Sequence, residues 1–138
     1  MRKRTQSRDF ALKILYQSDI TGKAILPTTE EFFTSTETKD VEVIDFSKRL
    51  VLGVEKNLSA IDAKIVQYAT NWDLKRMAII DRNILRLGVF ELNFISDVPP
   101  KVAINEAVEL AKRYGDSDSS KFVNGVLDKI HKTEIIPQ

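Results

Sequence analysis

The sequence has no cysteine and a single histidine among its 138 residues. Without thiols it can form neither a disulfide framework nor a Cys-ligated metal site, and one imidazole argues against a zinc hydrolase. Five glycines and four prolines are about half the share usual in globular domains, which favours helices over a turn-rich β fold. We therefore expect neither a metal nor an organic cofactor.

Long apolar runs and catalytic motifs are also missing. No apolar stretch approaches the ~20 residues of a membrane span, and Met1 is not followed by the apolar segment of a signal peptide. The five glycines are isolated from one another, so no glycine-rich phosphate loop occurs, and there is no nucleophile elbow. These absences predict a protein that is not an enzyme and that resides in the cytoplasm.

The charges are segregated although the net charge is only +1. Residues 1–13 hold five basic side chains and one acidic one, whereas residues 30–45 hold six acidic side chains and one basic one. A basic N-terminus on a nearly neutral chain predicts a local contact with a polyanion. The alternative is a solvated, frayed terminus.

Apolar residues recur at helical spacing along most of the chain, and no segment shows the alternation of a strand. The segment 74–94 is apolar on nearly every face, so we expect it to be the central helix, with Ile84 and Leu87 buried. Glu91 lies opposite the narrow polar stripe of this segment and needs a cation or backbone donors. Trp72 is expected to fill the core where two helices meet. The predicted fold is all-α, with about seven helices over residues 5–21, 28–33, 42–56, 59–70, 74–94, 101–114 and 118–132.

Three segments resemble the NusB family of transcription antitermination proteins. They are RDFALKILYQ at 8–17, DRNILRLGVFEL at 81–92, and the stretch from Asp97 to Asp128 that contains DVPPKVAINEAVELAKRYG and KFVNGVLD. They occur in the family's order and at its spacing. The resemblance implies a compact bundle of two packed helical subdomains, which we take as one domain over residues 1–138. It also implies binding of boxA RNA together with NusE, a small-subunit ribosomal protein, in a complex that makes RNA polymerase resist termination on ribosomal RNA operons.

The resemblance carries over to individual residues. In the N-terminal segment, basic side chains would attract phosphates, although Thr5 and Gln6 stand where many members have arginines. In the loop before the last helix, a carboxylate would accept hydrogen bonds from a base edge, and an aromatic ring nearby would stack on a base. For Asp118 a helix cap is the alternative role, and for Phe122 inward packing. The RNA contacts implied are Arg2, Lys3, Arg4, Arg8, Tyr114, Asp118, Lys121 and Phe122, and the NusE contacts implied are Tyr16 and Asp81.

Two other interpretations stay open. A NusB-like domain also forms the N-terminal region of some ribosomal RNA cytosine methyltransferases, but these 138 residues include no α/β cofactor domain, so we expect no catalysis from them. The chain could instead be a helical interaction module without RNA binding, which the departures at Thr5 and Gln6 favour. A homodimer that hides the basic terminus is part of this second interpretation, and sedimentation distinguishes it.

Overall fold

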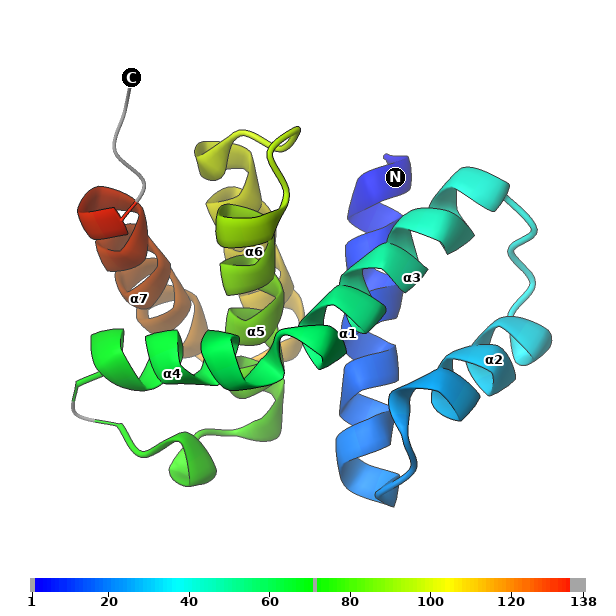
Figure 1. The fold of residues 1–138 in the computed structure, drawn as a ribbon, viewed down its shortest axis with the longest axis horizontal. Coiled ribbons are helices and arrows are strands. Elements are labelled where there is room, and N and C mark those ends of the chain that lie inside the picture. Colours follow the sequence, from blue (N-terminus) through cyan, green and yellow to red (C-terminus); the bar gives the residue numbers. More distant parts are fainter. Residues whose placement is uncertain (1, 71, 135–138) are drawn as a thin grey trace.

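The computed structural model describes residues 2–70 and 72–134. Within these residues the chain forms seven α-helices, one turn of 3-10 helix and no strand, which confirms the predicted all-α fold (Figure 1). None of these helices is both long and apolar enough to cross a membrane. The elements are α1 (Lys3–Thr21), α2 (Ile25–Ser35), α3 (Val41–Lys56), α4 (Leu58–Tyr68), η1 (Leu74–Arg76), α5 (Ile79–Phe94), α6 (Pro100–Tyr114) and α7 (Ser119–Glu134).

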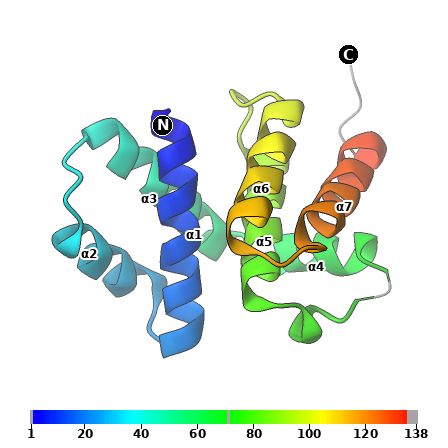
Figure 2. The same cartoon turned by 180° about the vertical axis from the view of Figure 1, so that it is seen from behind.

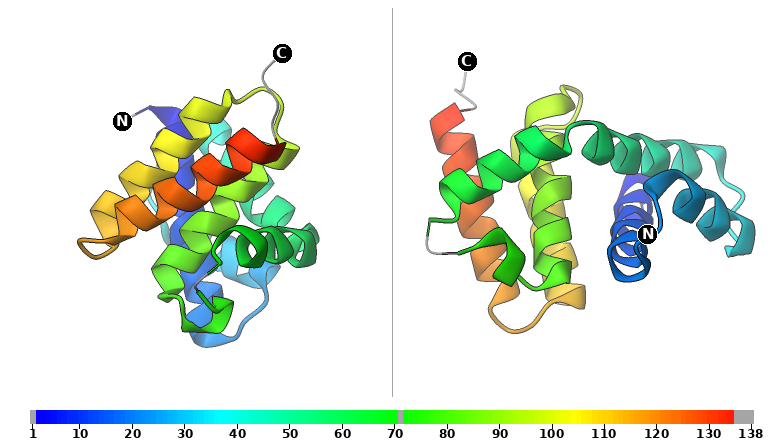
Figure 3. Two further views of the ribbon diagram at one scale, coloured as in Figure 1. Left: turned by 90° about the vertical axis from the view of Figure 1, so that its left-hand side faces the viewer. Right: turned by 60° about the horizontal axis from the view of Figure 1, so that its bottom comes forward.

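The helices form two groups that lie side by side, α1 to α3 in one and α4 to α7 in the other (Figures 1 and 2). Helices α3 and α4 follow each other along one side of both groups, with only Asn57 between them (Figure 3). The Asn57 side chain donates a hydrogen bond to the carbonyl of Gly53 at 2.9 Å and so helps to end α3. Across the junction, α1 packs against α5.

Helix α5 is central, as its apolar character predicted. It packs against α1, α3, α4, α6 and α7. Ile84 is fully buried and Leu87 is 2% exposed, which confirms both expectations. Close approach at two glycines makes this packing possible: a Cβ on Gly88 would lie 2.6 Å from Leu127, and one on Gly53 would lie 2.1 Å from the ring of Phe90.

The predicted helix over 74–94 is interrupted. Residues 74–76 form the 3-10 turn η1, Met77 and Ala78 are extended, and α5 begins only at Ile79. The Arg82 side chain donates to the carbonyl of Leu74 at 3.4 Å and ties this turn to α5. The sequence could not show the break because the apolar pattern continues through it.

Trp72 does not fill the core, contrary to the prediction. Its side chain is 53% exposed, whereas Ala69 and Met77 on either side of it are 4% and 5% exposed. These two smaller residues take the buried positions near the junction of α4 and α5, which leaves the indole on the surface. The indole contacts the ring of Phe122 of α7 at a tilt of 57°, with the ring centroids 5.4 Å apart.

Candidate nucleic-acid interface

A buried ion pair fixes the first helix against the centre of the fold. The Arg8 Nε donates to both carboxylate oxygens of Glu91, at 2.8 and 3.0 Å, and its Nη1 donates to Glu106 at 2.9 Å. Burial raises the pKa of Glu91, and the positive charge of Arg8 opposes that rise. The expectation that Glu91 is satisfied by a cation is confirmed. Because Arg8 is only 4% exposed and bound on both sides, we correct its predicted role from phosphate contact to positioning of α1.

Near the start of α1, exposed arginines from α1 and α3 lie close together. Arg4 of α1 lies over the ring of Phe46, with 4.3 Å between its Cζ and the ring centroid, and Arg49 of α3 approaches the same ring at 5.9 Å. Both arginines also reach Asp97, at 3.1 and 3.6 Å. We call Arg2, Arg4 and Arg49 the basic cluster, since Arg2 is exposed just before α1. Sequence reasoning missed Arg49 because a single arginine on an amphipathic helix carries no signal of its own.

Lys3 of the basic N-terminus forms ion pairs with the acidic segment 30–45. Its Nζ lies 3.3 Å from both Asp40 and Glu42, and hydrogen bonds to these carboxylates raise the pKa of Lys3. Asp40 also accepts a hydrogen bond from the Glu42 backbone at the start of α3. Packing of α3 along α1 therefore neutralises part of the basic terminus, and Lys3 contributes less positive potential than predicted.

Thr5 and Gln6, which stand where many family members have arginines, both form side-chain hydrogen bonds within the chain. The Thr5 hydroxyl donates to Glu106, and the Gln6 amide lies 3.5 Å from the hydroxyl of Thr38. Neither side chain supplies a cation. The surface potential at this end of α1 therefore depends on the basic cluster.

Asp9 of α1 interacts with three donors, two from the end of α6 and one from α1 itself. Its carboxylate accepts from the Tyr114 hydroxyl at 2.6 Å and from Arg113 at 2.9 Å, and it lies 3.1 Å from the Lys13 Nζ. Burial alone would raise the pKa of Asp9, but the hydrogen bonds from Tyr114 and Lys13 lower it below its ordinary value. The hydroxyl of Tyr114 is therefore committed, and only its half-buried ring is left for a ligand.

Tyr114 lies beside the predicted partner contact and not beside the basic cluster. It lines a pocket of about 290 Å³ together with Tyr16, which is 38% exposed, and Ile80. The next residue, Asp81, has one buried carboxylate oxygen with no hydrogen-bond partner among the described residues. That oxygen is closed to a partner, but Asp81 as a whole is half-buried and its other oxygen is not buried, so a donor from a partner can reach that oxygen. Tyr16 and the neighbourhood of Asp81 thus fall on one surface.

Asp116, and not Asp118, caps the last helix. Asp116 Oδ1 accepts from the backbone N–H groups of Asp118 and Ser119, at 2.9 and 3.1 Å. The Asp118 side chain is exposed and forms no hydrogen bond or ion pair with a residue that the structure describes. Asp118 directly precedes α7 and its backbone carbonyl accepts from the Phe122 N–H at 3.1 Å, but its side chain forms no capping hydrogen bond within the described residues, so the carboxylate is available to a ligand.

The predicted RNA contacts form two separate surfaces. Arg4 is bound to Asp97 before α6, whereas Asp118 follows the other end of that helix, whose 15 residues span about 22 Å (Figure 2). Lys121 and Phe122 lie one turn after Asp118 on α7, and Lys121 is exposed. Phe122 is half-buried against Trp72, so inward packing and an accessible edge are both present. A ligand that uses both surfaces must therefore be extended.

An all-helical fold with exposed arginines, an exposed carboxylate and surface aromatic rings describes a protein built for binding. The chain belongs to the NusB family, whose profile matches residues 5–132. The transcription antitermination protein NusB of Anaeromyxobacter dehalogenans (strain 2CP-1) is 49% identical over 128 residues, which are 93% of this chain and 89% of that protein.

Solved structures agree with this assignment. NusB from T. maritima superposes with a TM-score of 0.87 at 39% identity, covering 96% of this chain and 92% of that one. A crystal structure of the antitermination factors NusB and NusE in complex with dsRNA includes a chain that is 33% identical, with a TM-score of 0.87 and coverage of 96% and 98%. The family that the sequence motifs indicated is thereby confirmed.

Proposed function

We propose that this protein is a transcription antitermination factor that binds boxA RNA together with NusE. The observation that carries the proposal is the match, over 96% of this chain, to a chain of the complex of NusB, NusE and RNA. The role is non-catalytic, and it places the protein in the cytoplasm, within an RNA polymerase complex that transcribes ribosomal RNA operons. The relatives' shared name, transcription antitermination protein NusB, supports this assignment.

The two RNA surfaces have different physical roles in this proposal. The basic cluster attracts phosphates without reading the RNA sequence, because the phosphate group is chemically the same at every nucleotide. Asp118 repels phosphates, so any contribution from it requires a donor on a base edge, such as a cytosine amino group. Lys121 and Phe122 add a phosphate contact and an aromatic edge beside it. Specificity therefore resides at the start of α7, and general affinity at the start of α1.

NusE docks, in this proposal, on the surface that contains Tyr16 and Asp81. The pocket between α1 and the start of α5 is mostly apolar, and Tyr16 and Lys13 of α1 are among the residues that line it. Asp81 is half-buried, and its carboxylate oxygen that is not buried offers an acceptor for a donor from the partner. Tyr114 lines the same pocket, so we assign its ring to this docking surface and its hydroxyl to the support of Asp9.

A titration of labelled RNA tests the proposal. The protein, alone and with NusE, is added to an RNA that carries boxA and to a scrambled RNA of the same length, and binding is followed by fluorescence anisotropy. We expect NusE to strengthen binding of the boxA RNA and to increase its preference over the scrambled RNA. Equal affinities for the two RNAs in the presence of NusE would overturn the proposal.

A further inference from the structure

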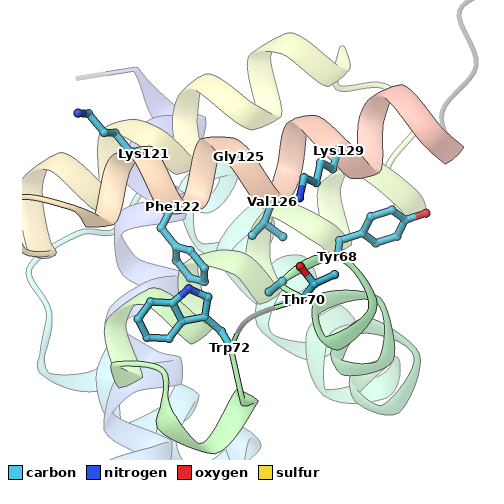
Figure 4. A pocket seen from close by; sticks show the side chains of 9 residues that line it. Tyr68, Thr70, Trp72, Lys121, Phe122, Gly125, Val126 and Lys129 are labelled. Atoms are coloured by element: carbon cyan, nitrogen blue, oxygen red, sulfur yellow. The ribbon is translucent and has the colours of Figure 1, made fainter.

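A surface pocket with aromatic side chains lies beside α7, C-terminal to Asp118. Trp72 and Phe122 form one wall of a surface pocket of about 220 Å³ between α7 and the segment that follows α4 (Figure 4). The two rings are tilted by 57° with centroids 5.4 Å apart, and the indole remains 53% exposed. The indole is therefore in contact with Phe122 while about half of the residue stays open to solvent. Tyr68 and Thr70 line the pocket on the opposite side from α7.

Gly125 keeps this pocket open. It lies in the interior of α7, where glycine is less favourable than alanine, and it lines the pocket. At Gly53 and Gly88 an added Cβ would meet a side chain at less than 3 Å, so packing within the chain accounts for those glycines. At Gly125 an added Cβ would meet nothing within 4 Å. Packing within the described chain therefore does not require this glycine, and its missing side chain leaves room for a ligand.

Two of the residues that line the pocket are lysines without an ion pair to any residue that the structure describes. Lys121 and Lys129 lie toward its two ends on α7 (Figure 4), and both side chains are exposed. Neither forms an ion pair with a residue that the structure describes, whereas Lys132 on the same helix is paired with Asp128 at 2.9 Å. In Figure 4 the Lys129 ammonium lies on the pocket side of α7, whereas the Lys121 side chain extends away from the aromatic wall. An anionic chain that carries aromatic bases is complementary to this arrangement, with one cation at the pocket and one farther along the helix.

The pocket is continuous with the proposed RNA surface. Asp118, Phe122, Gly125 and Lys129 follow one another at intervals of four, three and four residues, so they form one strip along α7. A strand that meets Asp118 and continues along this strip reaches the pocket within the length of the helix. No helix has to move for this path to be available.

We propose that the Trp72–Phe122 pocket binds an unstacked base of single-stranded RNA, with Lys121 and Lys129 contacting the adjoining phosphates. Stacking on aromatic side chains beside lysines is how proteins bind single strands without reading every base. This inference rests on the proposed function and adds to it a subsite formed by Trp72, Gly125 and Lys129. A protein segment is the less favoured occupant, because only an acidic segment would complement the charges of the two lysines.

The only tryptophan of the chain reports directly on this pocket. The experiment titrates the full-length protein with a single-stranded RNA that carries boxA and records tryptophan fluorescence and the anisotropy of the labelled RNA. We expect the fluorescence to be quenched in parallel with binding, because a base stacks on or beside the indole. A perfect duplex of the same sequence should not quench it, because paired bases cannot enter the pocket.

Two pairs of variants identify the cause of the signal. Gly125→Leu fills the pocket from an exposed helical position and should abolish the quenching and weaken binding about tenfold, a modest loss for one stacked base. Asn124→Leu adds the same side chain to the same helix at an exposed residue outside the pocket and should change neither readout. Lys129→Gln should weaken binding and reduce its salt dependence, whereas Lys132→Gln should do neither.

The outcomes separate this inference from the proposed function. If boxA RNA binds but the fluorescence does not change and Gly125→Leu binds as tightly as the parent, the pocket inference is overturned while the proposed function stands. If NusE alone quenches the indole and RNA adds nothing, the pocket is a protein site and the inference is overturned. If the parent binds no RNA even with NusE, both proposals fail.

Discussion

Arg8 and Glu91 form an ion pair across the junction of the two helix groups, in which both carboxylate oxygens share the Arg8 Nε–H, and their side chains are only 5% and 2% exposed. The pair joins the second turn of α1 to the last turns of the central helix α5, and Glu106 of α6 accepts a further hydrogen bond from Arg8. The orientation of α1 therefore depends on a charge that is not available to solvent. Arg8 thereby fixes the helix that carries Arg4, one of the arginines that we propose contact RNA.

Removing Arg8 should destabilise the protein strongly. Arg8→Ala leaves the Glu91 carboxylate buried and unpaired, so we expect the free energy of unfolding in urea to fall by about 3–5 kcal/mol. Adding Glu91→Gln to Arg8→Ala should recover part of that loss, because it removes the uncompensated charge. Arg4→Ala is the control, since its ion pair is exposed and contributes about 1 kcal/mol or less. Equal losses for Arg8→Ala and Arg4→Ala would contradict this account of the pair.

Asp9 should make stability depend on pH in the acid range. Because its folded pKa lies below the ordinary value of about 4, Asp9 stabilises the fold fully above that value. That contribution disappears as the pH falls through the lowered folded pKa. The parent should therefore lose more stability between neutral pH and about pH 3 than Asp9→Asn does, as measured by urea unfolding. Asp45→Asn, which removes one negative charge at an exposed position of α3, is the matched control for the change in net charge.

Two glycine substitutions should have opposite effects on stability. Gly53→Ala places a methyl group 2.1 Å from the buried ring of Phe90, and such overpacking typically costs about 1–3 kcal/mol. Gly125→Ala meets no neighbour within 4 Å and should stabilise α7 by about 0.5–1 kcal/mol through helix propensity. Thermal unfolding of the two variants measures both effects. A destabilised Gly125→Ala would show that this glycine is needed for packing after all.

The basic cluster and Asp118 should be separable by salt. Replacing Arg4 and Arg49 with alanine should reduce the log–log salt slope of RNA binding by about 0.7 for each phosphate that the variant no longer neutralises. The decrease in affinity should be similar for boxA and scrambled RNA. Asp118→Asn should leave the slope nearly unchanged and alter the preference for boxA. A shallower slope for Asp118→Asn, with its preference intact, would reverse the two assignments.

Asp81→Lys should weaken binding of NusE without unfolding the protein. The substitution replaces an acceptor at the proposed docking surface with a cation, and at the start of α5 it costs about 0.3–1 kcal/mol of helix-dipole stabilisation. Isothermal titration calorimetry with NusE measures the binding, and circular dichroism checks the fold. Asp45→Lys, at an exposed residue of α3, should bind NusE normally. Unchanged affinity for Asp81→Lys would remove this residue from the docking surface.

Sequence alone was sufficient for features that depend on neighbouring residues. Helical periodicity is a local property, so it predicted seven helices and the central position of α5, with Ile84 and Leu87 buried. It also required a partner for Glu91, because a carboxylate on an apolar face is costly wherever the helix packs. Family motifs indicated the NusB family, since they are stretches of sequence.

Only the tertiary structure assigned individual side chains to surface or interior. Arg4 and Arg8 look alike in sequence, but the partner that buries Arg8 lies 83 residues away. Arg49 joins Arg4 because α3 packs on α1, and Trp72 is exposed because Ala69 and Met77 take the buried positions. In each case burial is determined by an element distant in sequence or by competition among neighbours for one site. Helical periodicity specifies which face of a helix is apolar, and the packing of other elements decides which residues of that face remain accessible.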